Sequence, residues 1–563
     1  MDLINSLFQW LDVNTARYGW VAWTAFGCTA AGVLAAPRNP AAPVGIAGRA
    51  FFAAGIVLTL VAFRWPSWFA PTDLNPDEAQ MLAGAITLQR FPVYWKYVDG
   101  TTHGPLCELP LNVAGWLGAP LNYVTARVVA ALLLAVSLIG AWGTLRCFAA
   151  ERVARLAVLP GLAFLSLVSL HEYICYSSEL SGLVLVSLAT WALARVLTAP
   201  VVGRSQRVQI FFAGVVLGAV PFAKLQSAPQ AAALTVIALA LLGRTKKLTP
   251  PVRWSLARWL VAGGLLVPAL TFTFLVVYGL VGQFTKSYIL ISFEYTSSGA
   301  RLSEMPYRFL GFALNGYSFA WFFAGTLAFG LLYAHAIRRA TPALRTAHTI
   351  SWVLLGVAFA CVILPGRECP HYLHLLVVPA TLVAGLALAG AVERPETEGS
   401  RGPLAWTVVA WFVGLALVPQ INQWTVSEHE FCGKFKANLA TRSAAAKFMA
   451  RLAKQSDTLA MWGWEANLYV ETGLAQATRE GHSALEIAAT PVQAFYMNRY
   501  LSDMRRHQPE WFVDAVGPGG FQYEDRSLYG HEMYPGLRDL VASQYELVGE
   551  FENKRVYHRK NGL

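Results

Sequence analysis

A series of long apolar runs limits what this chain can fold into. A helix needs roughly 20 consecutive apolar residues to cross a bilayer, where every backbone hydrogen bond must be satisfied within the protein. Runs of about that length recur along most of the sequence, so we predict a mainly α-helical polytopic membrane protein with about 12 transmembrane helices. The predicted spans are residues 19–36, 45–63, 123–145, 153–170, 180–198, 208–223, 228–243, 257–280, 309–336, 349–365, 371–391 and 403–420.

The charged residues agree with this fold and give it an orientation. They make up 14% of the 563 residues, against 55% hydrophobic residues, whereas a soluble protein carries roughly 25% charged residues. The formal net charge is +11, but the excess lies in short loops between alternate spans, which is typical of cytoplasmic loops rather than of a nucleic-acid-binding surface. We therefore predict a multi-pass membrane protein, in contact with the lipid bilayer and not with nucleic acid, whose composition suits the inner membrane of a bacterium. Its other loops, 64–122, 281–308 and 366–370, then face the exterior.

The C-terminal part of the chain has a different composition. From about residue 424 charged and amide residues become more frequent, and no further spanning run occurs. We predict a transmembrane domain, 1–423, followed by an extracytoplasmic soluble α/β domain, 424–563. Within it, residues 457–464 and 509–516 are typical of strands, residues 465–473 of a short helix ended by Gly473, and the last two strand-like segments of a closing hairpin.

The loop 64–122 contains an adjacent pair of carboxylates, Asp77 and Glu78, just after an apolar run. A carboxylate at the membrane surface can act as a general base, because partial burial and neighbouring charges tune its pKa. The same two residues, preceded by Pro76, also suit the first turn of a helix, where they would serve as caps. The pair therefore predicts either a catalytic site or a helix start.

Later in the same loop lie Lys96, Asp99 and His103. Lys96 and His103 can bind a phosphate, the first as a cation and the second as a hydrogen-bond donor. The aromatic residues around them can instead form a belt at the membrane interface. Asp99 adds an acidic group to the same stretch.

Two residues next to predicted spans extend this set of candidates. Glu179 opens an apolar helix and is either a cap or a second acidic group facing the same outer cavity. Lys224 lies between two spans, where it either extends towards water or neutralises an anionic headgroup. The outer loop 281–308 has the length of a lid or of a disordered connection.

The segment PGRECPHYLHLLVVP, residues 365–379, places Arg367, His371, Tyr372 and His374 at the outer end of a span. An arginine suits bidentate contact with a phosphate. His371 and His374 are three residues apart, which can place both on one helix face and allow a metal pair. No carboxylate partner is identifiable from the spacing, so a divalent metal is a candidate cofactor and none is certain.

With these residues in view, the chain resembles the GT-C superfamily of membrane glycosyltransferases. The resemblance is to the bacterial branch related to protein O-mannosyltransferases and lipid A aminoarabinose transferases. NPDEAQMLAGAITL resembles the family's Asp-Glu pair in the first outer loop, and DGTTHGPL its later His/Lys-x-Pro stretch. RECPHYLHLLVVP resembles the late Arg…His-Tyr…Pro signature, and WGWEANLYVETGLAQATR the start of the C-terminal domain. The order of these motifs over residues 45–563 carries the resemblance, whereas the span 19–36 and the sequence His103-Gly104-Pro105 depart from the family pattern.

The resemblance implies transfer of a sugar from a polyprenyl-phosphate donor to a lipid, glycan or protein acceptor at the extracytoplasmic face, with inversion. The catalytic residues would be Asp77 and Glu78, with Asp77 taking the proton from the acceptor hydroxyl. Glu179 and Asp99 would face the acceptor cavity. The donor phosphate would be held by Lys224, Arg367, His371, Tyr372, His103 and Lys96.

Two other functions fit a polytopic chain with an outer domain. A transporter or flippase for a lipid-linked substrate tends to show inverted repeats and charges in mid-membrane, whereas the charges here collect at the predicted outer face. A non-catalytic scaffold of an envelope assembly complex should tolerate the substitution Asp77→Asn. That substitution therefore separates the enzyme from the scaffold.

Overall fold

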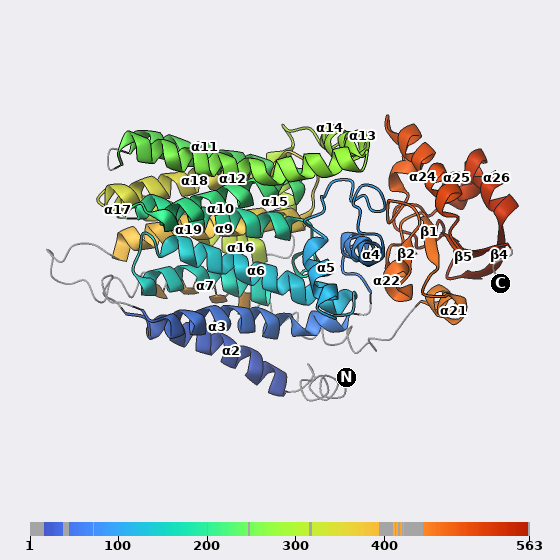
Figure 1. The fold of residues 1–563 in the computed structure, drawn as a ribbon. Coiled ribbons are helices and arrows are strands. Elements are labelled where there is room, and N and C mark those ends of the chain that lie inside the picture. The colour runs from blue at the N-terminus through green and yellow to red at the C-terminus, as the bar shows by residue number, and fades with distance from the viewer. Residues whose placement is uncertain are drawn as a thin grey trace.

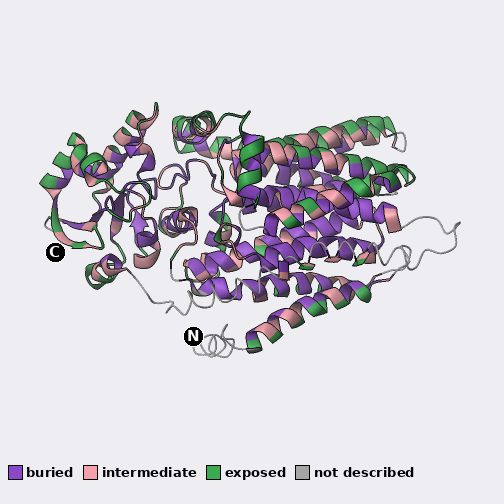
Figure 2. Ribbon diagram, turned by 180° about the vertical axis from the view of Figure 1, so that it is seen from behind, coloured by how far each residue is buried: buried purple, intermediate pink, exposed green. Residues whose placement is uncertain are grey.

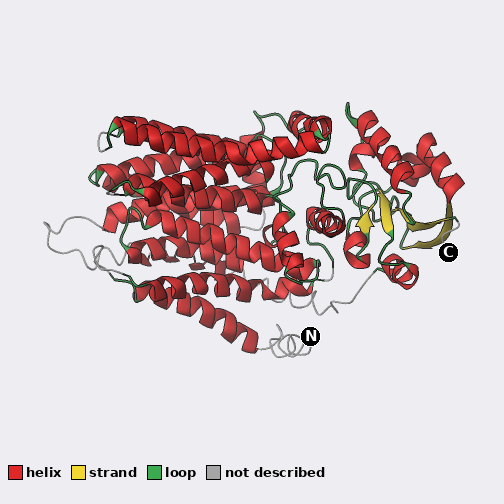
Figure 3. Ribbon diagram, viewed as in Figure 1, coloured by secondary structure: helices red, strands yellow, loops and turns green. Residues whose placement is uncertain are grey.

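A bundle of long helices and, beyond one end of it, a smaller unit with a β-sheet make up the described chain (Figure 1). The computed structural model describes residues 16–37, 44–70, 72–199, 201–245, 248–314, 318–392 and 443–560, with a few positions between 409 and 421. Helices dominate, and the strands of the described residues all lie in the C-terminal unit (Figure 3).

The helices of the bundle run back and forth between the end near the sheet and the end far from it. The longer ones are α2 (Ala16–Leu34), α3 (Ile46–Arg64), α6 (Tyr123–Leu145), α7 (Glu151–Leu167), α9 (Glu179–Thr198), α10 (Arg204–Ala219), α11 (Ala228–Arg244), α12 (Pro250–Val277), α16 (Ser318–Leu332), α18 (Pro342–Ile363) and α19 (His374–Val392). Shorter elements join them: η1 (Trp65–Phe69), α4 (Pro76–Arg90), α5 (Leu109–Trp116), α8 (His171–Ile174), η2 (Val220–Phe222), η3 (Leu225–Ser227), α13 (Val281–Phe284), η4 (Thr285–Leu290), α14 (Ile291–Ser297), α15 (Met305–Leu314), α17 (Ala334–Ile337) and η5 (Pro370–Leu373).

Eight helices within the described residues are long and apolar enough to cross a membrane. They coincide with eight of the twelve predicted spans and confirm a polytopic helical fold. Predicted spans 19–36 and 153–170 correspond to α2 and α7, and span 309–336 is divided between α15 and α16; none of these helices is among the eight. Span 403–420 lies for the most part outside the described residues.

Helix α19 lies in the middle of the bundle. Its most apolar stretch is 89% buried, against 17% for α12, and the burial colouring shows the same contrast between interior and periphery (Figure 2). The sequence HLLVVPATLVAGLALAGAV is apolar on every face, which suits a helix enclosed by other helices. The site described below forms where this central helix begins.

The two long outer loops contain short helices, one of which, beginning at Pro76, was among the alternatives that the sequence offered. Loop 64–122 folds into α4 and α5, and loop 281–308 begins with α13, the π-helical turn η4 and α14. Both lie at the end of the bundle that faces the sheet (Figure 1). The apolar residues of α4 are buried in the protein, whereas Leu290, Phe293 and Leu302 of the second loop are exposed.

The C-terminal unit has a five-stranded sheet in the order β2-β1-β3-β5-β4. Strands β1, β2 and β3 pair in parallel, while β5 pairs antiparallel with β3 and β4. The strands are β1 (Thr458–Trp462), β2 (Ala475–Gln476), β3 (Trp511–Asp514), β4 (Tyr545–Phe551) and β5 (Lys554–Arg559). The helices are α21 (Ala444–Leu452), α22 (Asn467–Thr472), α23 (Ala484–Ile487), α24 (Gln493–His507), α25 (Arg526–Tyr529), η6 (His531–Met533) and α26 (Pro535–Gln544).

The local predictions for this unit are confirmed. Strands β1 and β3 lie within the two predicted strand segments, and α22 ends at Gly473, whose φ of 74° suits a glycine in the left-handed region. The closing hairpin forms with Glu552 and Asn553 at its turn, both at positive φ, 52° and 64°. A turn of that kind matches the twist of the strands that it joins.

The C-terminal unit packs directly on α4. The backbone N–H of Gln476 donates to Thr87 Oγ1 at 2.9 Å. Arg499 forms an ion pair with Asp99 at 2.8 Å, and the Asp99 N–H donates to the Arg479 carbonyl at 2.8 Å. The unit thus holds the segment that carries the candidate residues of the first loop.

Candidate functional site

The start of α4 positions the adjacent carboxylates Asp77 and Glu78. Asn75 caps the helix by accepting a hydrogen bond from the Asp77 N–H at 2.8 Å, Pro76 occupies the first turn, and both acids follow. These are the residue types that favour a helix N-terminus. Asp77 and Glu78 therefore do lie in the first turn of a helix. Because they are consecutive residues of that turn, their side chains point to different sides of it.

Glu78 points into the protein and is fully paired. Its carboxylate is buried and accepts hydrogen bonds from Arg127 at 2.8 Å and 3.2 Å, from the Leu74 N–H and from the Tyr176 N–H. Arg127 also donates to backbone carbonyls of the segment before α4. Glu78 and Arg127 thus fix the entry of the chain into α4.

Asp77 points the other way and stays accessible. Its side chain is 39% exposed, and its Oδ2 lies 4.0 Å from His371 Nε2. His371, on η5, is buried and is held from behind by Glu172 of α8, whose Oε2 lies 2.5 Å from His371 Nδ1. Asn75 donates to the other oxygen of Glu172 at 2.9 Å. The cap of α4 and the histidine therefore share one carboxylate.

Lys224 and Glu179 lie beneath this histidine. Both are buried, and they form an ion pair. Lys224 Nζ also donates to Ser178 Oγ at 2.7 Å and lies over the ring of Tyr372, 4.8 Å from its centroid. Glu179 Oε2 lies 3.9 Å from His371 Nε2, so the same imidazole nitrogen faces two carboxylates.

Arg367 is linked to this group by Tyr295 and Tyr372. The Tyr372 and Tyr295 hydroxyls are 3.0 Å apart, and the Arg367 guanidinium stacks on the Tyr295 ring at 4.7 Å. It donates to Ser298 Oγ at 2.9 Å. Of the cationic side chains in this group, Arg367 is the one without a carboxylate partner among the described residues.

Two carboxylates of this group are paired, Glu179 with Lys224 and Glu172 with His371. Burial alone would raise the pKa of Glu172, but the hydrogen bond and charge of His371 lower its pKa overall, so it stays ionised. The half-exposed carboxylate of Asp77 and the guanidinium of Arg367, which has no carboxylate partner among the described residues, stay available to a ligand. Such an arrangement can take a proton from a hydroxyl and hold an anion beside it.

The other predicted residues make their direct polar contacts outside this group, although His103 lies near enough to Lys224 and Asp77 for their charges to act on it. His103 is buried against Glu108 at 2.8 Å, and Asp99 is paired with Arg499 at 2.8 Å. Burial lowers the pKa of His103, but the Glu108 carboxylate outweighs this and raises its pKa overall. Lys96 lies over the Tyr97 ring, 5.1 Å from its centroid. These side chains make their polar contacts within the first loop or with the C-terminal unit.

Sequence reasoning left three contributors out of the predicted site: Asn75, Glu172 and Tyr295. Asn75 was given no role of its own, and Glu172 lies far from His371 in the sequence. Tyr295 was one of many Ser and Tyr residues in loop 281–308. The signal available was the Asn-Pro-Asp-Glu sequence, since an Asn cap has a free amide that can orient a second carboxylate.

The predicted metal pair, His371 and His374, is not held as a pair. His374 Nδ1 contacts the His371 carbonyl at 3.0 Å, whereas His371 Nδ1 faces Glu172. Among the described residues, a group of three potential metal ligands within 4.8 Å of one another occurs elsewhere, at Asp514, His531 and Glu532 of the C-terminal unit.

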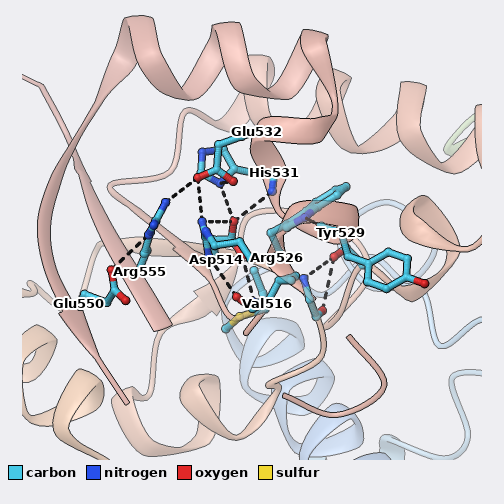
Figure 4. Close-up of polar contacts among 12 residues, drawn as sticks. Asp514, Val516, Arg526, Tyr529, His531, Glu532, Glu550 and Arg555 are labelled. Atoms are coloured by element: carbon cyan, nitrogen blue, oxygen red, sulfur yellow. Dashed lines mark hydrogen bonds and ion pairs between the residues drawn. The ribbon is translucent and has the colours of Figure 1, made fainter. Parts of the chain in front are cut away.

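That C-terminal group is closed by arginines (Figure 4). Arg526 donates to Asp514 at 2.8 Å and to Glu532 at 2.9 Å, and Arg555 donates to Glu532 at 2.7 Å. His531 Nδ1 lies 2.5 Å from Asp514. The guanidinium groups thus contact Asp514 Oδ2 and Glu532 Oε1, and the group fits an ion-pair network better than a metal site.

No model of a protein family matches the sequence, and no curated protein matches it. Solved structures do. The chain is 14% identical to ArnT from Cupriavidus metallidurans bound to undecaprenyl phosphate, over 92% of this chain and 99% of that chain, with a TM-score of 0.53. The apo state of ArnT matches at 14% identity, 90% and 98% coverage and a TM-score of 0.46.

A more distant match is the archaeal oligosaccharyltransferase AglB from Archaeoglobus fulgidus, in complex with an inhibitory peptide and a dolichol-phosphate. It is 11% identical over 88% of this chain and 72% of that chain, with a TM-score of 0.46. These proteins are GT-C glycosyltransferases. At 14% identity and a TM-score of 0.53, the likeness to ArnT bound to undecaprenyl phosphate shows a shared fold, which agrees with the fold that the sequence motifs predict.

Proposed function

We propose that this protein is a membrane glycosyltransferase that transfers a sugar from a polyprenyl-phosphate donor to a hydroxyl acceptor, with Asp77 as the general base. The observation that carries the proposal is the half-exposed Asp77 carboxylate 4.0 Å from the buried His371, next to cationic side chains. The fold shared with ArnT, which was solved with undecaprenyl phosphate, supports this class of donor.

The proposed reaction proceeds with inversion. Asp77 takes the proton of the acceptor hydroxyl as its oxygen bonds to the anomeric carbon of the sugar. The bond from that carbon to the phosphate oxygen breaks, and its electron pair leaves with the polyprenyl phosphate. Asp77 is suited to this step because its carboxylate is accessible, while Glu78, Glu172 and Glu179 are each held by cations or hydrogen-bond donors.

The leaving phosphate requires stabilisation, since negative charge grows on it as the bond breaks. We assign this to Arg367 and His371, with Lys224 and Tyr372 behind them. Arg367 has no carboxylate partner among the described residues and presents a planar fork that suits phosphate oxygens. The charge of Lys224 is already shared with Glu179, so Lys224 supports the group from below.

The remaining predicted residues receive positioning roles in this proposal. Glu78 holds the start of α4 through Arg127, and Asp99 holds the C-terminal unit through Arg499. Glu179 orients Lys224 and His371. Phosphate binding by Lys96 and His103 stays a prediction, as does a divalent metal.

We infer the location of the protein from its basic loops and from the position of the candidate site. A lipid-linked sugar and its acceptor would meet at the exterior face of the bacterial inner membrane, with the site and the sheet unit on that side. The sheet unit covers the first loop and is therefore suited to contact the acceptor. We place the boundary of this extracytoplasmic domain near residue 424, ahead of α21.

The test is sugar transfer by the full-length protein in vesicles. A panel of radiolabelled polyprenyl-phosphate sugars is offered with endogenous envelope acceptors, comparing the wild type with Asp77→Asn. The matched control is Asp539→Asn, which removes an exposed carboxylate whose ion-pair partner among the described residues is its neighbour Arg538. We expect transfer from one donor, its loss in Asp77→Asn and its retention in Asp539→Asn.

Two results would contradict the proposal in different ways. Equal transfer by the wild type and Asp77→Asn would remove Asp77 from the chemistry. No transfer from any donor, together with movement of a donor across the bilayer, would favour a flippase. Retention of an envelope complex by Asp77→Asn in the absence of any transfer would favour a scaffold.

A further inference from the structure

An apolar cavity of about 370 Å³ lies at the end of the bundle far from Asp77. Helix α9 connects the two places: Glu179 at its start belongs to the candidate site, and Thr198 at its end lines the cavity. Twenty residues of helix separate them, which is a distance of roughly 30 Å. The cavity therefore belongs to the opposite side of the bundle and has no part in the proposed reaction.

The walls of the cavity offer almost no hydrogen bonds. They are formed by α6, α9, α11, α12, α18 and α19, largely through Leu, Ala, Val and Ile side chains. Most hydroxyl groups on the walls donate to carbonyls of their own helix, as seen at Thr144, Thr190, Thr198, Thr346 and Ser351. A cavity of this kind is unfavourable for water, which needs several polar partners, and suits a hydrocarbon chain.

We take as the mouth of the cavity the end formed by the helix ends and connections, where three arginines are close in sequence to lining residues. The lining continues from the ends of α9 and α11 into the connections that follow, and to the start of α18. The exposed side chains Arg195, Arg244 and Arg345 each lie within one or two residues of lining positions. The sequence contains no Asp or Glu between Glu179 and Glu294, so α9 beyond its first residue and the whole of α11 bring no carboxylate to this end. Helix α18 has none either.

We propose that this cavity binds an anionic glycerophospholipid of the leaflet at that end, with an acyl chain inside and the phosphate at the arginines. Its volume lies in the range of about 300–1,000 Å³ usual for ligand sites. No ion pair joins Arg195, Arg244 or Arg345 to a carboxylate of the described residues, and arginines at a membrane surface attract anionic headgroups. The apolar walls thus suit the acyl chain of the lipid, and the arginines at the mouth suit its anionic phosphate.

The polyprenyl tail of a donor is the rival occupant. Its phosphate would sit beside Asp77, so its chain would enter from the opposite end of the bundle. The basic mouth favours a ligand whose anionic group is at the far end, as in a phospholipid. The proposal is independent of the proposed function, since it holds whether or not the protein transfers a sugar.

The test uses photoactivatable lipids with the full-length protein in phosphatidylcholine nanodiscs. Phosphatidylglycerol with a diazirine in one acyl chain is compared with phosphatidylcholine carrying the same chain, and labelled peptides are identified by mass spectrometry. Ala238→Phe fills the cavity from α11, while Ala232→Phe places the same side chain on the exposed face of that helix. Ala347→Leu fills the cavity from α18, in case Ala238→Phe disturbs α11.

The charge is tested separately. The triple variant R195Q/R244Q/R345Q removes the arginines at the mouth, and R207Q/R338Q/R339Q removes the same charge from exposed positions elsewhere at that end. We expect phosphatidylglycerol to label the lining peptides about tenfold more than phosphatidylcholine, and each cavity-filling variant to lower this labelling to a similar degree. Ala232→Phe and the control triple should keep the labelling, and the mouth triple should abolish the preference between headgroups.

Three results would overturn the proposal. Equal labelling by both headgroups would remove the charge selectivity, and full labelling in both Ala238→Phe and Ala347→Leu would place the lipid outside the cavity. Displacement of the label by unlabelled polyprenyl phosphate, but not by unlabelled phosphatidylglycerol, would assign the cavity to the donor tail instead.

Discussion

Two clusters of charged side chains in this protein are built from similar residues and differ in how completely the charges are paired. In the C-terminal unit, Asp514 is buried and contacts Arg526 at 2.8 Å, the His531 N–H at 3.0 Å and His531 Nδ1 at 2.5 Å. At the end of the bundle, Asp77 is 39% exposed, and its nearest cationic partner, His371, is 4.0 Å away. The first carboxylate has no capacity left for a ligand, and the second has.

This difference in pairing separates a cluster that stabilises the fold from one that can bind a ligand. A buried charge is tolerated when hydrogen bonds and opposite charges satisfy it on every side, and removing one partner then costs much of that balance. A half-exposed carboxylate with a distant partner contributes little to stability but stays free to accept a proton. The number of charges is similar in the two clusters, so pairing and exposure carry the distinction.

The largest expected effect is on transfer in Asp77→Asn. Loss of a general base lowers a rate by about 10²–10⁴-fold. We expect a decrease of that size with an unchanged unfolding temperature, because Asp77 is weakly paired. The measurement is the initial rate of sugar transfer per amount of folded protein, alongside thermal unfolding of the same sample. A large drop in the unfolding temperature would mean that Asp77, like Asp514, mainly stabilises the fold, and the two clusters would then not differ in role.

The next effect is on stability in Asp514→Asn. Breaking a buried ion pair by removing one partner costs roughly 3–5 kcal/mol, and here Arg526 and His531 would both lose their carboxylate. We expect earlier unfolding of the C-terminal unit in denaturant, with Asp539→Asn as the unaffected control. A Zn²⁺-dependent rise in the unfolding temperature of the wild type, absent in Asp514→Asn, would instead make this cluster a metal site.

A third prediction concerns pH and a buried acid near the junction of the two parts. Burial and the nearby carboxyls of Asp99 and Asp503 raise the pKa of Glu486 to about 8. Between about pH 4.5 and pH 8 the folded protein keeps a proton that the unfolded chain releases, so stability falls as pH rises through that window. We expect Glu486→Gln to weaken this pH dependence, measured as unfolding midpoints at pH 6, 7 and 8.

The exposed Glu524 provides the control for this measurement, since Glu524→Gln should leave the pH dependence unchanged. An identical slope in the wild type and Glu486→Gln would mean that Glu486 is ionised in the folded protein. The junction between sheet and first loop would then contain an additional ion pair rather than a neutral acid.

Much of the fold follows from local patterns in the sequence. Spans such as 123–145 and 371–391 are predicted because a spanning helix depends on one continuous apolar run. The hairpin of β4 and β5 and the end of α22 at Gly473 depend on neighbouring residues as well. Loop 64–122 was harder, because α4 is stabilised by contacts with residues almost 400 positions later, such as Gln476.

The candidate site is predictable only in part for the same reason. Asp77, Lys224, Arg367 and His371 stand out as polar residues at span ends, and the structure places them at one end of the bundle. Their partners do not stand out: Glu172 reaches His371 across 199 positions, and Tyr295 reaches Tyr372 across 77. Sequence spacing also could not tell Asp77 from Glu78, since the direction of each side chain depends on Arg127 and His371.

The smallest expected effect is on donor binding in Arg367→Gln. This prediction compares the arginines of the two clusters. Arg526 is tied to two carboxylates, whereas Arg367 donates to Ser298 and stacks on Tyr295. If Arg367 contacts the donor phosphate, its loss should raise the KM for the donor about tenfold, the equivalent of one charge-assisted hydrogen bond. Arg367→Lys should recover part of this, because the charge returns without the planar fork. Arg526→Gln should leave that KM unchanged while lowering stability, and a KM that responds equally to both substitutions would mean that pairing does not distinguish the two clusters.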